Sequence, residues 1–267
     1  MIVPVYDAAD DVARCLDSLA ATLTPGVEVL LIDDASPDRR IAPLLQRTLA
    51  RPGPRWRRLT NPENLGFVAT ANRGFAATQG DIVLLNSDTQ VTSGWLDRLV
   101  TCAASDPRIA TITPFTNNGE IASFPEFCRP NPWPSDPERI ARACVAAGPP
   151  SYPDIPTAVG FCMYIRRAAL DKIGPFDPIF GRGYGEENDF SRRAAARGWR
   201  NVLCDDAYVA HRGNASFGLL GLKADRAALD LVTARHPDYR DLVSAFIATD
   251  PLAERRRKIK TALDRAG

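Results

Sequence analysis

Short apolar runs that end in clusters of polar residues constrain the fold of this chain more than any other feature. Residues 27–32 form one such run and end at the acidic pair 33–34, and residues 81–85 form another and end at the polar cluster 86–88. Amphipathic stretches separate these runs, which predicts an α/β fold with helices covering a mostly parallel sheet. Ligands of open parallel sheets bind beyond the carboxyl ends of the strands, so both clusters are candidate site residues.

The remaining helices and strands are predicted from the spacing of apolar residues, which recur every three to four residues in helices and form short apolar runs in buried strands. We expect a first helix capped within Asp7–Asp10, and a second whose cap is Ser36 or Asp38. Residues 114–157 are rich in Pro, Asn and Gly, which predicts a long loop that covers a site. We expect strands at about 2–5, 56–59, 158–165, 199–203 and 207–210, and helices at about 39–50, 66–78, 186–197 and from 222 onward.

The composition fits a globular protein with a core, since 45% of the residues are hydrophobic and 24% are charged. A net charge of +1, from 33 basic and 32 acidic residues, gives no reason to expect a nucleic-acid partner. The six cysteines form no CxxC pair, which predicts buried thiols in a reducing compartment. No apolar run approaches the roughly 20 residues that cross a bilayer, and no leader-like segment opens the sequence, so we expect a cytoplasmic protein.

Asp33 and Asp34 end a buried strand, where a carboxylate can accept hydrogen bonds from a nucleobase N–H and a ribose hydroxyl. Asp88 follows the next apolar strand, after Asn86 and Ser87. Mg²⁺ and Mn²⁺ take hard oxygen ligands and use one or two protein carboxylates beside substrate phosphates. Asp88 meets that requirement, although Asn and Asp are also common in ordinary turns.

Two further segments carry candidate chemistry. Residues 183–189 place three carboxylates at a helix start behind two glycines, either as a general base on a hinged loop or as acids that complement the helix dipole. In the second reading, Asp189 pairs with Arg193 one turn later. His211 follows the last predicted strand, beside Ser216, and is a candidate for a metal or phosphate contact. His236 has no such context and is predicted to be structural.

Five motifs together resemble a family 2 glycosyltransferase over about residues 2–217. They are Val-Pro-Val-Tyr at 3–6, the acidic turn at 33–38, the segments 64–67 and 72–74, Asn-Ser-Asp at 86–88, and Gly-Glu-Glu-Asn-Asp at 185–189. The resemblance implies a GT-A fold in one domain over residues 1–220, with a nucleotide-sugar half at about 1–113 and an acceptor half at 114–220. A helical extension occupies 221–267. It also implies an enzyme that transfers a sugar with inversion at the sugar carbon.

The same resemblance assigns the donor site residue by residue. Pro4 and Tyr6 would border the base, and Asp33 and Asp34 would hold uracil or thymine and the ribose. Asp88 matches the last acid of a DxD motif, and with His211 it would bind Mg²⁺ or Mn²⁺, although Asn86 stands where many members have Asp. The other implied donor-site residues are Asn64, Gly66, Asn72, Asn86, Ser87 and Ser216.

Glu187 falls where the family's catalytic base is usually Asp, and Asp189 remains a second candidate. The implied partners are a UDP- or dTDP-sugar donor and a glycan or lipid-linked acceptor, such as a precursor of a bacterial surface glycan. An inverting transfer needs one carboxylate base and no carboxylate nucleophile. The basic run at 255–258 could contact an anionic membrane surface or form a solvated helix face.

Two other functions remain as alternatives. A nucleotidyltransferase would need a Gly-rich, basic phosphate loop after the first strand, and residues 6–10 are acidic and lack Gly. A non-catalytic relative of the fold would bind a sugar nucleotide or a partner protein without turnover. Hydrolysis of a sugar-nucleotide donor separates this second alternative from an enzyme.

Overall fold

The computed structural model describes residues 1–213 and 226–265, and its centre is a seven-stranded sheet in the order β3-β2-β1-β4-β7-β6-β8. Only β7 runs antiparallel to its neighbours, so the mostly parallel sheet is confirmed. A second, two-stranded sheet pairs β5 with β9. The strands are β1 (Ile2–Val5), β2 (Glu28–Asp33), β3 (Arg55–Thr60), β4 (Ile82–Leu85), β5 (Thr89–Gln90), β6 (Ile109–Phe115), β7 (Cys162–Ile165), β8 (Arg200–Tyr208) and β9 (Ala210–His211).

Helices cover both faces of the sheet because neighbouring strand residues point to opposite sides and both sets are apolar. Val3 and Leu31 pack against α1, α2 and α4, whereas Ile2 and Leu30 pack against α3, α6 and α7. The helices of these layers are α1 (Ala9–Thr22), α2 (Ile41–Thr48), α3 (Phe67–Ala76), α4 (Trp95–Ser105), α6 (Arg167–Ile173) and α7 (Glu186–Ala195).

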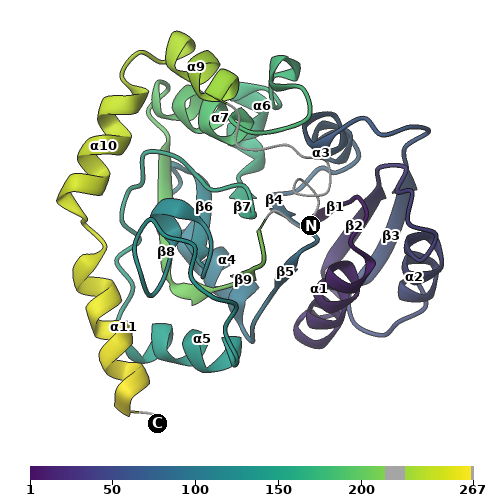
Figure 1. The fold of residues 1–267 in the computed structure, drawn as a ribbon, viewed down its shortest axis with the longest axis horizontal. Helices are drawn as coiled ribbons and strands as arrows, with labels where there is room; N and C mark the ends of the chain where they lie inside the picture. Colours follow the sequence, from purple (N-terminus) through teal and green to yellow (C-terminus); the bar gives the residue numbers. More distant parts are fainter. Residues whose placement is uncertain (214–225, 266–267) are drawn as a thin grey trace.

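The C-terminal helices run down one side of the molecule (Figure 1), as α9 (Arg226–Arg235), α10 (Tyr239–Thr249) and α11 (Ala253–Arg265). The helical extension from about residue 222 is therefore confirmed over its described part. Helix α9 packs on the α7 side of the sheet, and α11 packs with α5 (Pro137–Ala146) in a third apolar cluster. No helix among the described residues is long and apolar enough to cross a bilayer.

Several local expectations are wrong. Residues 114–157 are not one long loop, because they contain η1 (Glu120–Ala122) and the ten-residue α5. Asp136 caps α5 and Pro137 occupies its first turn, a start signal that the prediction overlooked. The two strands expected between 199 and 210 are one strand, β8, followed by the short β9.

The predicted helix caps are also wrong. Helix α1 begins after Ala8, which has φ 54° and gives no side-chain cap, and the Asp7 carboxylate instead accepts the N–H of Asp38 at 3.0 Å. Helix α2 begins at Ile41 without a side-chain cap. Ser36 accepts the N–H of Asp7 at 3.2 Å, because tertiary packing brings the loops after β1 and β2 together and offers closer partners than the next helix.

The basic run at 255–258 is mostly engaged with the protein itself. Arg255 donates to the carbonyl of Asp205 and to carbonyls at the end of α5, and Arg256 is buried against Phe127 and Asp250. Arg257 and Lys258 both pair with Glu254. A fully solvated helix face is therefore wrong for the first two arginines, and only the last two cations of the run remain on the surface.

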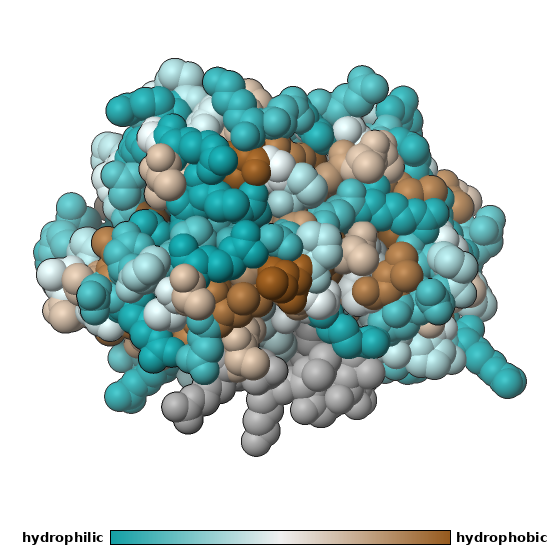
Figure 2. All heavy atoms as spheres, turned by 90° about the horizontal axis from the view of Figure 1, so that it is seen from above, coloured by the Kyte–Doolittle hydropathy of each residue, from teal (hydrophilic) through white to brown (hydrophobic). Residues whose placement is uncertain are grey.

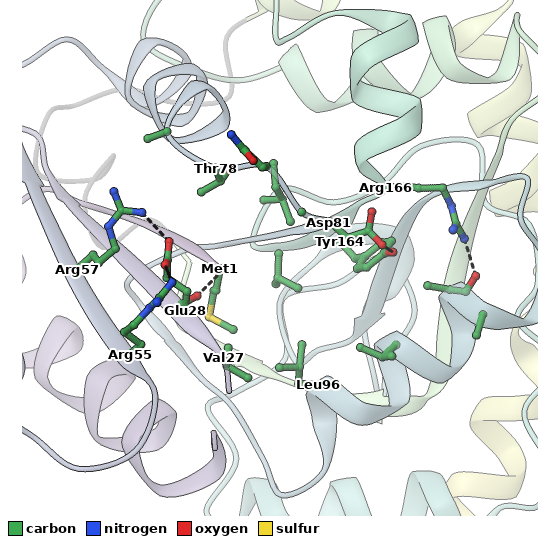
Figure 3. Close-up of a pocket in the computed structure, with 18 residues that line it drawn as sticks. Met1, Val27, Glu28, Arg55, Arg57, Thr78, Asp81, Leu96, Tyr164 and Arg166 are labelled. Carbon is green, nitrogen blue, oxygen red and sulfur yellow. Dashed lines mark hydrogen bonds and ion pairs between the residues drawn. The ribbon is translucent and has the colours of Figure 1, made fainter. Parts of the chain in front are cut away.

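Seen from above, the surface is largely hydrophilic, and its apolar residues lie in several small separate patches, one of them near the centre (Figure 2). A cavity of about 840 Å³ lies elsewhere, at the amino ends of β2, β3 and β4 (Figure 3). On one wall of this cavity, Arg55 and Arg57 pair with Glu28, and on another Asp81 accepts the hydroxyl of Tyr164. The charged groups named on these walls are therefore paired with one another. The cavity lies at the opposite end of the strands from Asp88.

Candidate active site

Asp88 and His211 form the first part of the site. Asp88 follows β4, and β9 brings His211 beside it because Thr89 of β5 pairs with His211. The Asp88 Oδ1 and His211 Nε2 atoms are 3.4 Å apart, and the backbone N–H of Arg212 donates to the Asp88 carbonyl at 3.0 Å. Both side chains are largely buried, with exposed fractions of 14% for His211 and 10% for Asp88. Two candidate metal ligands thus meet from distant parts of the chain.

Asn117 and Asn118 fix the orientation of His211. The Nδ1 atom lies 2.6 Å from the carbonyl oxygen of Asn118, which can only accept, so Nδ1 carries the hydrogen. The Asn117 amide exchanges two hydrogen bonds of 2.9 Å with the backbone of His211. A neutral ring held in this way directs the Nε2 lone pair toward Asp88. This is the tautomer that a metal-binding histidine needs.

Burial by itself lowers the pKa of His211, but the charge and hydrogen bond of Asp88 and the Asn118 carbonyl outweigh it, so the net pKa is raised. A proton on Nε2 therefore occupies the place that a cation would take between the two side chains. The described residues hold no group of three or more His, Cys, Asp or Glu side chains suited to a metal. The Asp88 carboxylate is the kind of oxygen ligand that Mg²⁺ and Mn²⁺ prefer, and these ions leave several positions to waters and phosphates.

Glu187 lies in the first turn of α7, behind Gly185 with φ 95°, and its Oε2 atom accepts the Gly185 N–H at 3.2 Å. The side chain is half-buried, so part of it remains open to solvent. Burial raises the pKa of Glu187 to about 7, the charge of Glu120 adds to the rise, and backbone N–H groups oppose it. A carboxyl with this pKa is suited to take up a proton near neutral pH.

Glu186 differs from its neighbour because it is buried, with 3% of its surface exposed. Its Oε2 atom has no hydrogen-bond partner among the described residues. Burial, followed by the charge of Glu187, raises its pKa well above the usual range. Burial and the neighbouring charge therefore both disfavour a second negative charge beside Glu187 at the start of the helix.

Gly160 and Phe161 bring Glu187 and His211 to the same place. A Cβ atom on Gly160 would lie 3.9 Å from the carboxyl carbon of Glu187, and the ring of Phe161 stacks on His211. The Asn86 N–H donates to the Phe161 carbonyl at 2.9 Å, so the turn before Asp88 is hydrogen-bonded to the Gly160–Phe161 pair. Gly160 and Phe161 carry no motif of their own, so they were not predicted as site residues.

Tyr184 is a second link between the metal pair and the base. Burial raises the pKa of its hydroxyl, and the negative charges of Glu187, Glu186 and Asp88 raise it further. Asp88 and Glu187 therefore both raise the pKa of this one half-buried phenol.

Asp189 faces away from this region. It is fully buried, and its carboxylate lies 2.6 Å from Arg193 Nε, 2.9 Å from His236 Nε2 and 3.2 Å from Arg235 Nε. The predicted pair between Asp189 and Arg193 is present. His236, predicted to be structural, lies just after α9 and is the second partner of this carboxylate.

Asp33 and Asp34 organise the loops after β2 and β3. Asp33 accepts the Ser36 N–H and pairs with Arg58, each at 3.0 Å. Asp34 accepts from the Asn61 amide at 2.6 Å and from the N–H groups of residues 65 and 66 at 2.8 and 2.9 Å. Each carboxylate oxygen has more than one lone pair, so these contacts leave acceptor capacity for a ligand.

The loop held by Asp34 reaches the loop before Glu187. The Phe67 N–H donates to the Arg182 carbonyl at 3.2 Å, and Asn64 accepts from the Arg182 guanidinium. A Cβ atom on Gly66, whose φ is 83°, would come within 3.0 Å of the Arg182 Cα. Gly66 is therefore required for this close approach, because a side chain there would meet both strain and backbone.

The remaining predicted donor-site residues lie in two places, at the carboxyl ends of the strands and on α3. Pro4 and Tyr6 lie at the carboxyl end of β1, where Pro4 pairs with Ile32, and Ser87 is buried in the turn before Asp88. Asn72 uses both atoms of its amide on the backbone of Phe176, at 2.8 and 3.0 Å, so it joins α3 to the segment before η2 (Pro178–Phe180). Ser216 lies outside the described residues.

The Asn-rich stretch 116–120 resembles members of the family that build bacterial surface polysaccharides, but Asn117, Asn118 and Glu120 were not predicted as site residues. They follow β6, a strand that the sequence analysis left unassigned, and this strand runs parallel to β8. Recognising it would have placed another polar cluster at the carboxyl end of a strand. Glu120 is exposed as a residue, but protein atoms surround its carboxyl group closely enough that burial raises its pKa.

Comparison with known proteins identifies the family. Residues 1–174 match the model of "Glycosyl transferase family 2". The chain belongs to this family. The match includes Asp33, Asp34 and Asp88 and ends before Glu187 and His211. This family 2 glycosyltransferase has the GT-A fold, and it is an enzyme that transfers sugars.

Among curated relatives, an N-acetylglucosaminyl-diphospho-decaprenol L-rhamnosyltransferase of Mycobacterium tuberculosis is 26% identical over 244 residues, 82% of this chain and 77% of that protein. The O-antigen biosynthesis protein RfbC of Myxococcus xanthus is 27% identical over 242 residues, 81% of this chain but 17% of that protein. The names of both relatives refer to the building of lipid-linked or surface glycans.

Solved structures show the same fold at low identity. GalNAc-T7 with UDP, GalNAc and Mn²⁺ has a TM-score of 0.63 at 15% identity, over 97% of this chain and 53% of that chain. The structure of S. aureus TarS 1-349 with UDP-GlcNAc has a TM-score of 0.60 at 15% identity, over 92% of this chain and 70% of that chain. This chain therefore spans about half of the first of these structures.

Proposed function

We propose that this glycosyltransferase moves a sugar from a UDP- or dTDP-sugar to an acceptor hydroxyl, with inversion at the sugar carbon. One observation carries the proposal. Phe161 stacks on His211, which lies beside Asp88, and the preceding residue, Gly160, lies against Glu187. A donor diphosphate on the first side and an acceptor hydroxyl on the second would meet between them.

Asp88 and His211 would hold a divalent cation, Mg²⁺ or Mn²⁺, between the Asp88 carboxylate and the Nε2 atom. When bound, such a cation neutralises charge on the leaving diphosphate. Asn118 keeps the hydrogen of His211 on Nδ1, so that Nε2 remains directed at the site. The solved neighbours that contain Mn²⁺ with UDP or with GDP-Man support this assignment by fold.

Pro4, Tyr6, Asp33, Asp34, Asn64, Gly66, Asn86 and Ser87 would form the donor side of the site. The carboxylates of Asp33 and Asp34 end β2 and set the shape of the loops around the base and ribose through their backbone contacts. We keep Asn72 as a support of this side, because its amide is used by Phe176.

Glu187 would accept the proton of the acceptor hydroxyl as that oxygen attacks the sugar carbon. Its pKa of about 7 makes it a base that is both ionised and basic enough near neutral pH. Asp189 is surrounded by Arg193, Arg235 and His236, which favours Glu187 over Asp189 as the base. Displacement by the acceptor oxygen is a single step and uses no carboxylate nucleophile.

We propose that the acceptor is a lipid-linked or surface-glycan precursor, on the strength of the two bacterial relatives. We do not assign membrane contact to residues 255–258, since Arg255 and Arg256 are engaged within the protein. The membrane-facing part of the chain, if the acceptor is lipid-linked, would then be the rim around Glu187.

The test is hydrolysis of a panel of UDP- and dTDP-sugars with and without Mn²⁺, read together with thermal protection by each donor. We expect one donor to raise Tm only when Mn²⁺ is present, because binding to the folded state stabilises it by mass action. The same donor should be hydrolysed slowly. Protection without any hydrolysis would instead indicate a binding protein.

A further inference from the structure

The buried contact between α7 and the segment that follows α9 points to a role for the C-terminal helices in the active site. Asp189 belongs to the first turn of α7, two residues after Glu187, and His236 follows the end of α9. The two helices lie side by side (Figure 1). The contact is unusual because it buries a carboxylate completely and surrounds it with three cationic or N–H-bearing side chains.

We propose that Asp189 is a positioning residue, and that His236 and Arg235 hold it so that Glu187 points into the active site. This inference rests on the proposed role of Glu187 as the base. It assigns to the C-terminal extension a part in catalysis that lies beyond the residues of the family match.

Helix geometry supplies the first argument. Successive residues of an α-helix are about 100° apart, so residues i and i+2 point about 200° apart, on opposite sides. Asp189 is directed at His236, and the Glu187 carboxyl is directed at Gly160. Fixing one of these side chains therefore fixes the rotation of the helix, and with it the direction of the other.

The charge balance supplies the second argument. An ionised carboxylate only accepts hydrogen bonds, so the Nε2 atom of His236 carries the hydrogen that it donates to Asp189 at 2.9 Å. Arg193 donates to the other oxygen at 2.6 Å and also binds the carbonyls of Ile173 and Pro175. A buried carboxylate that lost one of these partners would be left partly uncompensated, so α7 would move to find another.

The packing around Gly185 supplies the third argument. Val232 of α9 is fully buried, and a Cβ atom on Gly185 would lie 3.0 Å from its side chain. The N–H of Gly185 donates to Glu187, and its carbonyl accepts the N–H of Asp189. Helix α9 therefore touches the turn that carries the base both through Val232 and through the Asp189 cluster.

The experiment uses the full chain with His236→Ala, His236→Gln and the control Arg240→Ala. Arg240 of α10 pairs with the exposed Asp230 of α9 at 2.7 Å, and no contact joins it to Asp189 among the described residues. Donor hydrolysis is measured with Mn²⁺ and the fastest of UDP-glucose, UDP-N-acetylglucosamine and dTDP-rhamnose. Hydrogen exchange of the peptides that cover residues 183–190 is measured in parallel and needs no turnover.

We expect His236→Ala to lower kcat by about 10-fold to 10²-fold with donor affinity unchanged, the size of effect that a small misplacement of a reacting group produces. The midpoint of its pH profile should move to lower pH, because a loosened Glu187 is better solvated. Exchange at residues 183–190 should become faster. His236→Gln, which keeps an N–H donor, should recover much of the rate, and Arg240→Ala should behave as the unaltered protein.

Two results would overturn the inference. One is a folded His236→Ala variant with unaltered kcat, pH profile and exchange at 183–190. The other is an equal loss in Arg240→Ala, which would mean that any weakening of the C-terminal helices has the same effect. Full activity in Glu187→Gln would contradict the proposed base instead, and the exchange data would still report whether α9 holds α7.

Discussion

Phe161 stacks on the imidazole of His211 with ring centroids 5.1 Å apart and an angle of 22° between the rings. The residue before it, Gly160, lies against the carboxyl group of Glu187. The step between these two residues, just before β7, therefore joins the candidate metal ligand to the candidate base.

Replacing Asp88 by Ala should abolish Mn²⁺-dependent binding of the donor, because the remaining ligand is the single imidazole of His211. Calorimetry of donor binding with and without Mn²⁺ measures the effect. Asp97→Ala, which removes an exposed carboxylate from α4, is the matched control. Unchanged Mn²⁺-dependent affinity in Asp88→Ala would remove Asp88 from the site.

Replacing Glu187 by Gln should leave donor affinity intact and lower the rate of hydrolysis by about 10²-fold or more, the usual size of a general-base contribution. Steady-state rates and donor binding are measured on the same preparation. Asp189→Asn serves as the comparison. If Asp189→Asn loses the rate and Glu187→Gln keeps it, the base is Asp189.

The pH dependence of kcat/KM should follow the ionisation of Glu187. With a pKa of about 7, the carboxyl is protonated and inactive as a base below that pH, so the rate should rise through pH 7 and level off above it. The Gln variant should lack this rise. A flat profile in the unaltered protein between pH 6 and 8 would contradict the assignment.

The raised pKa of Glu187 also predicts that the ionised form, which acts as the base, lowers the stability of the folded protein. Because the folded-state pKa is raised from 4.5, the folded protein keeps a proton that the unfolded chain has lost between pH 4.5 and 7. The contribution of Glu187 to stability is therefore intact below pH 4.5, falls as the pH rises to about 7, and is constant above that pH. Glu187→Gln should raise Tm relative to the unaltered protein at pH 8, and by much less at pH 4, as measured by calorimetry.

Asp34→Asn should lower stability as well as donor binding. One oxygen becomes an NH₂ group that faces the donors on Asn61, Leu65 or Gly66, and a buried donor left without an acceptor costs about 1–3 kcal/mol. Thermal unfolding without ligand measures the first effect. An unchanged Tm would show that Asp34 serves the ligand alone and not the loop.

Much of the fold was predictable from local pattern. The run at 27–32 corresponds to β2, whose residues 29–32 are buried on one face or the other, and the helix expected from about residue 186 begins at Glu186. The missed elements have ordinary reasons. Helix α5 begins at the start signal Asp136-Pro137, but the Pro-rich composition around it favoured the prediction of a loop. Helix α4 and strand β6 contain no recognisable motif, so neither was predicted.

The sequence by itself determined that polar clusters follow β2 and β4, because strand periodicity and chain direction are properties of neighbouring residues. It left open which of the acids at 186, 187 and 189 faces the site, since all three lie within one turn of a helix. The tertiary structure separated Glu187 from Asp189, because Gly160, just before β7, lies against Glu187, whereas His236, just after α9, binds Asp189. The direction of His211 was decided in the same way by Asn117 and Asn118, since the choice of ring nitrogen depends on a partner far away in the chain.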